Sequence, residues 1–158
     1  MKLLLCGMGN KDRGDDGFGP YIVEHVQESD TVKKIDCNIY LENYLNQIVS
    51  LAPDLIVFLD TIKIDGVKPL LLKNNEILVI NPISVSTHNL PFSAVYRFLK
   101  QNTQAEIFFL GVPANSYNEF SQVTKEIADR ICSVFNSVDK QKKLNIINAY
   151  ENLSTAIR

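Results

Sequence analysis

The sequence predicts an α/β fold, a three-layer α/β/α sandwich with a mostly parallel, twisted sheet of about five strands. Short apolar runs alternate along the chain with segments whose apolar residues recur at helical spacing. One of these runs, residues 55–59, is apolar at every position, which is typical of a strand buried on both faces of a parallel sheet. The chain of 158 residues has the length of one ordinary domain, so we expect a single domain over residues 1–158.

The alternation of predicted strands and helices is clearest in the first half of the chain. Strands are expected over residues 3–5, 32–39 and 55–59, and helices over residues 21–26 and 41–52. The second helix has an apolar stripe made by Leu41, Tyr44, Leu45, Ile48, Val49 and Ala52. Pro53 and Asp54 are expected to end this helix.

The second half continues the alternation. Asp65 and Gly66 are expected to form a turn, followed by short strands over residues 69–72 and 76–80. A helix over residues 91–100, a buried strand over 106–110 and a helix over 119–134 complete the predicted sandwich. Residues 140–158 have a weaker helical pattern, and we expect them to pack on the domain or on a partner.

Composition and charge argue against several classes of partner. The net charge is −2 and there is no basic run, so neither nucleic acid nor an anionic membrane is favoured. No apolar run approaches the roughly 18 residues that span a bilayer, so membrane insertion is not expected. The N-terminal apolar run is too short for a signal peptide. The three cysteines have no C-x-x-C spacing and are expected to be reduced, partly buried thiols, which predicts a cytoplasmic protein.

Residues 6–20 form a glycine-rich connection between the first strand and the first helix. Gly7 and Gly9 allow backbone geometry that residues with a Cβ atom avoid. Asp15 and Asp16 lie where the helix is expected to begin, and an aspartate at that position often caps the helix. We expect one carboxylate to cap and the other to face a site. We favour Asp16 for the site because it directly precedes Gly17.

Other motifs of this kind are absent or incomplete. A dinucleotide-binding G-x-G-x-x-G motif would need a third glycine where the chain has Asp12, and the G-K-[ST] of a P-loop is missing. A nucleotide-binding domain is therefore a weak alternative. The chain also has no G-x-S-x-G elbow of a serine hydrolase and no H-E-x-x-H motif of a zincin.

Three polar residues that are distant in the sequence are expected to meet at one edge of the sheet. Asp16 follows the first strand, Asp60 ends the strand over residues 55–59, and His88 lies in a polar loop. In a parallel sheet the ligand crevice lies beyond the carboxyl ends of the strands. Two carboxylates and an imidazole suit nickel, zinc, iron or manganese. Taken singly, each aspartate could instead cap a turn, and the histidine could be a surface residue.

The motifs that carry these residues resemble those of the hydrogenase maturation proteases. The resemblance lies in G-M-G-N at 7–10 followed by D-D-G-F-G at 15–19, in Asp60 at the end of an apolar strand, in T-H-N-L-P at 87–91 and in L-G-V-P at 110–113. It covers about residues 1–135. It implies a fold of the phosphorylase/hydrolase-like kind. The T-H-N-L-P segment looks most like the branch that serves membrane-bound, energy-converting or formate-linked hydrogenases.

The chain departs from the family pattern after the second strand. The family usually has Asp-Gly-Gly there, whereas this chain has Asp36, Cys37 and Asn38, so the flexible glycine pair is missing. The family's glutamine before the late proline is also absent. Asp36 keeps the carboxylate, and two roles stay open for it: a catalytic residue beside Asp16, or a purely structural residue.

The resemblance implies an endopeptidase that removes a C-terminal extension from the large-subunit precursor of a [NiFe] hydrogenase after nickel insertion. It implies that Asp16, Asp60 and His88 contact nickel carried by that precursor, and that Gly7, Gly9 and Asn10 form a substrate-binding loop. Isolated protein could bind adventitious zinc, cadmium or calcium at the same place. Either the metal polarises the scissile carbonyl, or Asp16 or Asp36 activates a water molecule.

Two other functions are compatible with the same residues. One is a metal-dependent hydrolase with its own bound metal. The other is a non-enzymatic chaperone for a nickel protein. Both would use the carboxylate and imidazole groups without removing a C-terminal extension.

Overall fold

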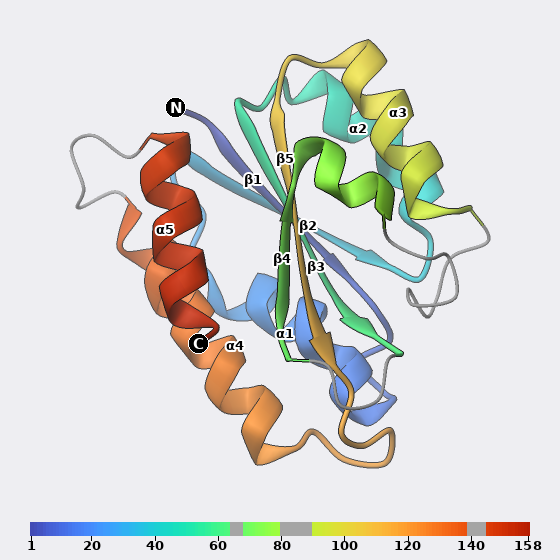
Figure 1. Ribbon diagram of the computed structural model, residues 1–158, viewed down its shortest axis with the longest axis vertical. Coiled ribbons are helices and arrows are strands. Elements are labelled where there is room, and N and C mark those ends of the chain that lie inside the picture. Colours follow the sequence, from blue (N-terminus) through green and yellow to red (C-terminus); the bar gives the residue numbers. More distant parts are fainter. Residues whose placement is uncertain (64–67, 80–89, 139–144) are drawn as a thin grey trace.

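A five-stranded sheet forms the middle layer of the computed structural model, which describes residues 1–63, 68–79, 90–138 and 145–158 (Figure 1). The strands are β1 (Leu3–Met8), β2 (Val32–Asn38), β3 (Leu55–Ile62), β4 (Leu70–Lys73) and β5 (Glu106–Pro113). Their order in the sheet is β2-β1-β3-β5-β4. All neighbouring strands run parallel except β4, which pairs antiparallel with β5 at one edge. The predicted mostly parallel sheet is confirmed.

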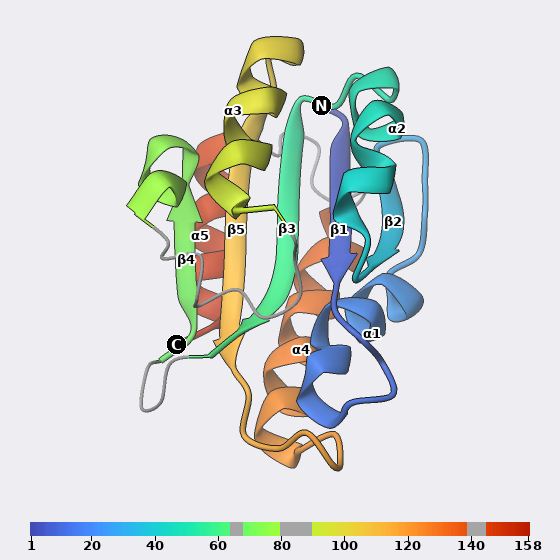
Figure 2. The same ribbon diagram turned by 90° about the vertical axis from the view of Figure 1, so that its right-hand side faces the viewer.

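Helices cover both faces of the sheet, which confirms the predicted three-layer arrangement (Figure 2). One face packs against α1 (Phe18–His25), α4 (Gln122–Asn136) and α5 (Ile146–Ala156). The other face packs against α2 (Leu45–Ser50), the 3₁₀ helix η3 (Asn74–Val79) and α3 (Phe92–Asn102). No helix in the described ranges is long and apolar enough to cross a bilayer.

Alternation along the central strands divides the core between these two faces. Val57 and Leu59 of β3 join the core beneath α1, α4 and α5, whereas Ile56 and Phe58 join the core beneath α2 and α3. All eight residues of β3 are buried, as expected for a central strand with helices on both sides. The apolar run at 55–59 therefore predicted the strand correctly, although β3 continues through Asp60 and Thr61 to Ile62.

One predicted strand is wrong. Residues 76–79 lie in η3 and not in a second short strand beside β4. Asn74 turns the chain with a positive φ of 51°, and its side-chain oxygen accepts a hydrogen bond from the Ile107 N–H at 3.0 Å. The positive φ and this bond to β5 favour a turn at Asn74 over continued extension. Ile80 and the predicted turn at Asp65 and Gly66 lie outside the described residues.

The predicted helix over residues 41–52 begins with a separate 3₁₀ turn, η2 (Leu41–Tyr44), before α2. The C-terminal helical pattern is confirmed as α5, which packs on α4. There Arg130 of α4 donates to the Ala156 carbonyl at 3.4 Å and to the Arg158 carbonyl at 3.1 Å. Within the described part of the tail, the predicted packing on the domain is therefore the one observed.

Candidate functional site

The connections after β1 and β5 lie together with the end of β3 at the carboxyl end of the parallel strands (Figure 2). β1 and β3 are neighbours in the sheet, with Gly7 in register with Leu59. β3 is in turn paired with β5, with Asp60 in register with Gly111. This arrangement is the one in which α/β sheets usually bind ligands.

Glycine residues let the connection after β1 fold back tightly onto the sheet. Gly9 has a φ of +123°, and a Cβ atom there would lie 2.1 Å from the carbonyl oxygen of Asp16. At Gly19, in the first turn of α1, a Cβ atom would lie 2.5 Å from the Leu59 carbonyl oxygen. These close approaches need glycine. They place the 3₁₀ turn η1 (Gly14–Gly17), and with it both aspartates, against the ends of β1 and β3.

The carboxylate of Asp16 is buried and is held by two different segments. Its Oδ2 accepts a hydrogen bond from the Asn10 N–H at 2.9 Å, and its Oδ1 accepts one from the Thr61 hydroxyl at 2.9 Å. Thr61 also donates its backbone N–H to Asp60 Oδ1 at 2.8 Å. Both aspartates are fully or almost fully buried, with exposed fractions of 1% and 0%. Thr61 therefore joins Asp16 and Asp60 into one buried cluster, as their expected convergence requires.

Asp15 has a different role from its neighbour. Its Oδ1 accepts from the Ser121 N–H at 2.7 Å, and its Oδ2 accepts from the Ser121 hydroxyl at 2.8 Å. Oδ2 also accepts from the N–H groups of Asn115 at 2.7 Å and Ser116 at 3.1 Å. Ser121 is the N-cap of α4, so Asp15 places a negative charge where that helix has unpaired N–H groups.

The expectation that one of the two aspartates caps its own helix is wrong. No side chain caps η1 or α1 with a hydrogen bond. Asp15 reaches the start of α4 instead, more than 100 positions further along the chain. This interaction could not be read from the local pattern, because an aspartate at a helix start has the same sequence appearance whichever helix it binds.

Tyr117 lies beside the acidic cluster on the connection after β5. Its pKa is raised, first by partial burial and then by the charges of Asp16, Asp60 and Asp15, while Arg13 lowers it. The Arg13 guanidinium carbon lies 5.1 Å from the centre of the Tyr117 ring. The phenol thus stays protonated at neutral pH and can donate a hydrogen bond. Neither Tyr117 nor Thr61 was identified from the sequence.

Asp36, another predicted site residue, is less closely connected to the buried cluster of Asp16 and Asp60. Asp36 lies on β2, half-buried and in register with Gly7, and its Oδ1 accepts from the Asn38 N–H at 3.0 Å. β1 separates β2 from β3, so Asp36 lies two strands away from Asp60. His88 lies outside the described residues. Among the residues that the structure does describe, no group of three or more His, Cys, Asp or Glu side chains could hold a metal ion.

Of the predicted substrate-binding loop, Gly7 and Gly9 are buried and Asn10 is half-buried. The Gly9 N–H donates to the Asn38 carbonyl at 2.9 Å, which closes the loop against the end of β2. Asn10 accepts from the Asp12 N–H at 2.9 Å through its side-chain oxygen. These bonds give the loop a fixed shape, and its role in substrate binding remains a prediction.

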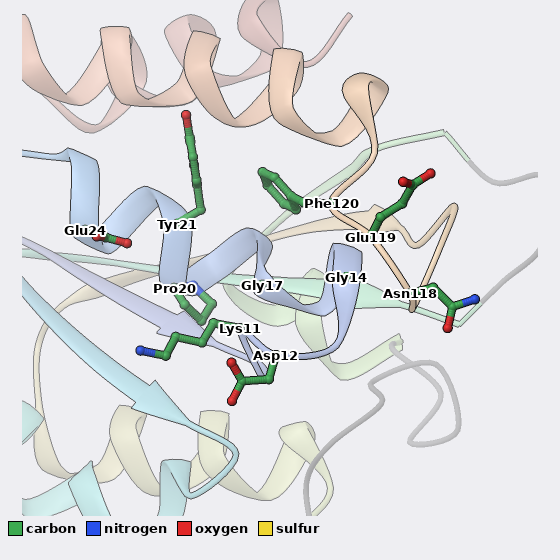
Figure 3. Close-up of a pocket in the computed structure, with 10 residues that line it drawn as sticks. All are labelled: Lys11, Asp12, Gly14, Gly17, Pro20, Tyr21, Glu24, Asn118, Glu119 and Phe120. Carbon is green, nitrogen blue, oxygen red and sulfur yellow. The ribbon is translucent and has the colours of Figure 1, made fainter.

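A cavity of about 340 Å³ lies on the outer side of this connection (Figure 3). It is bordered by the glycine-rich connection, by α1 and by residues 118–120. Figure 3 shows Tyr21 and Phe120 on its helix side and Asp12 and Lys11 on its loop side. Asp16, Asp36 and Asp60 are not among its lining residues, so this cavity is separate from the acidic cluster.

The cysteines are all free and buried, which agrees with the predicted reduced thiols. Burial raises the pKa of Cys6 well above its usual value, and the neighbouring Cys37 thiol raises it further. A thiol with a raised pKa is a poor nucleophile at neutral pH. Cys6 therefore has the chemistry of a core residue, although it lies close to the site in the sequence.

Comparison with known proteins gives one consistent family. A family model described as "Hydrogenase maturation protease" matches residues 20–141. A putative hydrogenase maturation protease of Methanocaldococcus jannaschii is 28% identical, over 90% of this chain and 91% of the relative. The hydrogenase 3 maturation protease of Escherichia coli is 28% identical, over 87% of this chain and 88% of the relative.

Solved structures show the same likeness. The crystal structure of a [NiFe] hydrogenase maturation protease from Thermococcus kodakarensis is similar to this chain with a TM-score of 0.74 and 29% identity. That match covers 89% of this chain and 93% of the other. The solution structure of an Escherichia coli endopeptidase has a TM-score of 0.71 at 22% identity, over 88% and 92% of the two chains, which supports the fold.

Proposed function

Because this chain belongs to the hydrogenase maturation protease family, we propose that it removes the C-terminal extension of a [NiFe] hydrogenase large-subunit precursor once nickel has been inserted. Membership in the family makes the chain a hydrogenase maturation endopeptidase. The timing of the cut, the identity of the precursor and the roles of individual residues are our proposal. A cytoplasmic location, favoured by three free cysteines, belongs to the same proposal.

The observation that supports this proposal most directly is the joining of Asp16 and Asp60 through Thr61. Asp16, in η1 after β1, and Asp60, near the end of β3, supply two buried carboxylates. Carboxylate oxygens are ligands that zinc and similar divalent metals accept. We propose that His88 supplies an imidazole to the same set. Nickel that is already ligated by the precursor could complete its coordination here, so that the metal acts as a recognition mark on the substrate.

The proposal does not give the protein a resident metal. Nickel arrives with the precursor, and zinc, cadmium or calcium bound to isolated protein would be adventitious. The bonds from Asn10 and Thr61 fix the orientation of the Asp16 carboxylate before any substrate binds. A fixed orientation lowers the entropic cost of meeting a substrate group in the correct geometry.

Two ways of promoting hydrolysis are compatible with this arrangement. The nickel can polarise the scissile carbonyl as a Lewis acid, or a carboxylate can act as a general base. Asp16 and Asp36 are the proposed candidates for the base. The separation of Asp36 from β3 by β1 favours Asp16 for any step that occurs beside Asp60.

The test is to mix the purified chain with nickel-loaded precursor and with nickel-free precursor, and to follow the mass of the large subunit. We expect a shorter product only from the nickel-loaded form. Asp16→Ala, Asp60→Ala and His88→Ala should each abolish or strongly slow the cut, and Asp36→Ala measures the contribution of the second candidate base. Asp12→Ala is the matched control, because Asp12 is an exposed carboxylate of the same connection.

Three results would contradict the proposal. Equal cutting of nickel-free precursor would remove the role of nickel as a mark. Stoichiometric, tightly bound metal in freshly purified protein would favour a hydrolase with its own metal. Binding of nickel-loaded precursor without any shorter product would favour a chaperone.

A further inference from the structure

The connection from β5 to α4 is mostly solvent-exposed, yet it is firmly attached to the glycine-rich connection. Residues 114–120 are all exposed or half-exposed. Asp15, which is fully buried, accepts four hydrogen bonds from this connection and from the start of α4, and its own N–H donates to the Ser116 carbonyl at 2.8 Å. Ordering an exposed loop costs conformational entropy. The four bonds to the buried Asp15 carboxylate and the one from its backbone N–H offset this cost and hold the connection in one position.

The backbone at Gly14 also packs closely against the connection from β5 to α4. Its φ is +57°, and a Cβ atom there would lie 2.6 Å from the Ser116 carbonyl oxygen and 2.7 Å from the Tyr117 carbonyl carbon. The two connections therefore approach each other more closely than any residue with a side chain would permit. The peptide of Tyr117 is fixed against the residue that precedes Asp15.

The attachment fixes the Tyr117 side chain at the border of the acidic cluster. Arg13 lies over its ring at 5.1 Å, and the side chain is nevertheless 37% exposed. The residues that contact Tyr117, Arg13 at its ring and Gly14 at its peptide, directly precede Asp15 and Asp16, so the ring lies near the buried carboxylates. The charges of Asp16 and Asp60 accordingly raise the pKa of the phenol. A tyrosine in this position has one polar end near the site and an open surface that a second molecule can contact.

We propose that Tyr117 is a substrate-contacting residue, which binds the extended peptide of the precursor beside Asp16 and Asp60, and that Asp15 is the positioning residue that holds Tyr117 there. This inference rests on the proposed function. The ring packs against the peptide, and the phenol donates a hydrogen bond to a peptide carbonyl. Asp15 acts only through the connection that it binds, and it does not touch the substrate.

The arrangement explains why two adjacent aspartates have separate tasks. Asp16 bonds towards Asn10 and Thr61, and Asp15 bonds away from them, towards residues 115–121. The turn η1 therefore positions the Asp16 carboxylate in the site. Through Asp15, the same turn also positions residues 115–121 at the border of the site. The substrate contact is made by Tyr117, which is far along the chain from the glycine-rich connection.

The test is steady-state kinetics on nickel-loaded precursor, with KM and kcat measured separately. Tyr117→Ala should raise KM about tenfold and change kcat by less than about threefold, because uniform binding is lost and the reacting groups are kept. Tyr117→Phe keeps the ring and should raise KM by a smaller factor. Tyr40→Ala, at an exposed tyrosine on the connection after β2, is the matched control and should leave both constants unchanged.

Asp15→Asn replaces an acceptor oxygen by a donor amide and should also raise KM. If Asp15 acts through Tyr117, the double variant Asp15→Asn/Tyr117→Ala should have a KM no higher than the more affected single variant. A purely structural role for Asp15 would instead lower the thermal midpoint and reduce kcat, with KM effects that multiply in the double variant, and this would overturn the positioning part.

Failure of this inference is distinguishable from failure of the proposed function. If the wild-type chain does not cut the nickel-loaded precursor, both are wrong. If the wild type cuts it while Tyr117→Ala leaves KM within twofold of the wild-type value, or changes kcat alone, the substrate contact is wrong and the proposed function stands.

Discussion

The Thr61 hydroxyl donates a hydrogen bond to Asp16 Oδ1 at 2.9 Å, which joins the end of β3 to the connection after β1. The two residues are 45 positions apart in the chain and are both buried. A buried carboxylate needs its donors, because a lost partner leaves an unpaired charge in a medium of low polarity. This one bond therefore contributes both to stability and to the geometry of the candidate site.

Replacing Thr61 by Val keeps the shape of the side chain and removes its donor. We expect Thr61→Val to lower the free energy of unfolding by about 1–3 kcal/mol, because a charged acceptor loses a partner. Thr61→Ser keeps the hydroxyl, and its free energy of unfolding should fall less. Urea unfolding of the two variants measures the difference, and equal stability of Thr61→Val and wild type would show that the bond contributes little.

Ser121 has two functions, as the N-cap of α4 and as a donor to Asp15. Removing an N-cap side chain typically costs about 1 kcal/mol. Ser121→Ala should cost more than this, roughly 2 kcal/mol, because the buried Asp15 carboxylate also loses a donor. The matched control is Asn145→Ala, which removes the N-cap of α5. The Asn145 side chain accepts a hydrogen bond from the Asn148 N–H at 2.8 Å.

Unfolding by urea at neutral pH compares the two cap variants directly. The free energy of unfolding should fall more in Ser121→Ala than in Asn145→Ala. Equal losses would mean that Asp15 finds a replacement donor when the serine is removed.

Hydrophobic patterning was sufficient to predict the fold, because most of the strands and helices follow from the local periodicity of apolar residues. The apolar run at 55–59 and the helical stripe within residues 119–134 correspond to β3 and to most of α4. The pattern failed at residues 76–79, where a short apolar stretch is compatible with either a strand or a turn of helix. Side-chain bonds made by Asn74 determine the outcome there, and they involve β5, about 30 positions away.

The site was partly predictable for a related reason. The rule that parallel strands end at one edge brought Asp16 and Asp60 together correctly. The same rule gives no information about which of two adjacent aspartates faces that edge. It also could not identify Tyr117, whose position depends on the bonds between Asp15 and residues 115–121. Such pairings are tertiary, and no spacing within the glycine-rich segment encodes them.

Gly9 offers a test of the close approach between the connection and η1. Gly9→Ala would place a Cβ atom 2.1 Å from the Asp16 carbonyl oxygen, at a φ of +123° that other residues rarely adopt. We expect a loss of about 3 kcal/mol or more, or failure to fold, together with loss of peptidase activity. The control is Gly17→Ala, where the nearest atom would be the Lys11 Cα at 3.2 Å and φ is −79°.

Circular dichroism and thermal unfolding compare the two glycine variants. Gly17→Ala should fold and retain most of its stability. A fully stable, active Gly9→Ala protein would mean that the connection can rearrange without displacing Asp16.

Stability should fall at alkaline pH because of Cys132. Burial, and to a smaller extent the nearby charge of Asp129, raise the pKa of this thiol from its usual 9.0 to about 11. Between these values the unfolded chain loses the thiol proton while the folded chain keeps it, so the folded state binds more protons. The contribution to stability is complete below about pH 9 and decreases as the pH rises towards 11.

Urea unfolding at pH 8 and at about pH 10 measures this decrease, and Cys132→Ala isolates the thiol from other groups that titrate in the same range. The variant should be less stable than wild type at pH 8, because a buried side chain has been shortened. Its stability should nevertheless fall less between the two pH values. An equal fall in both proteins would show that Cys132 ionises with nearly the same pKa in the folded and unfolded states, so that its burial does not exclude the thiolate.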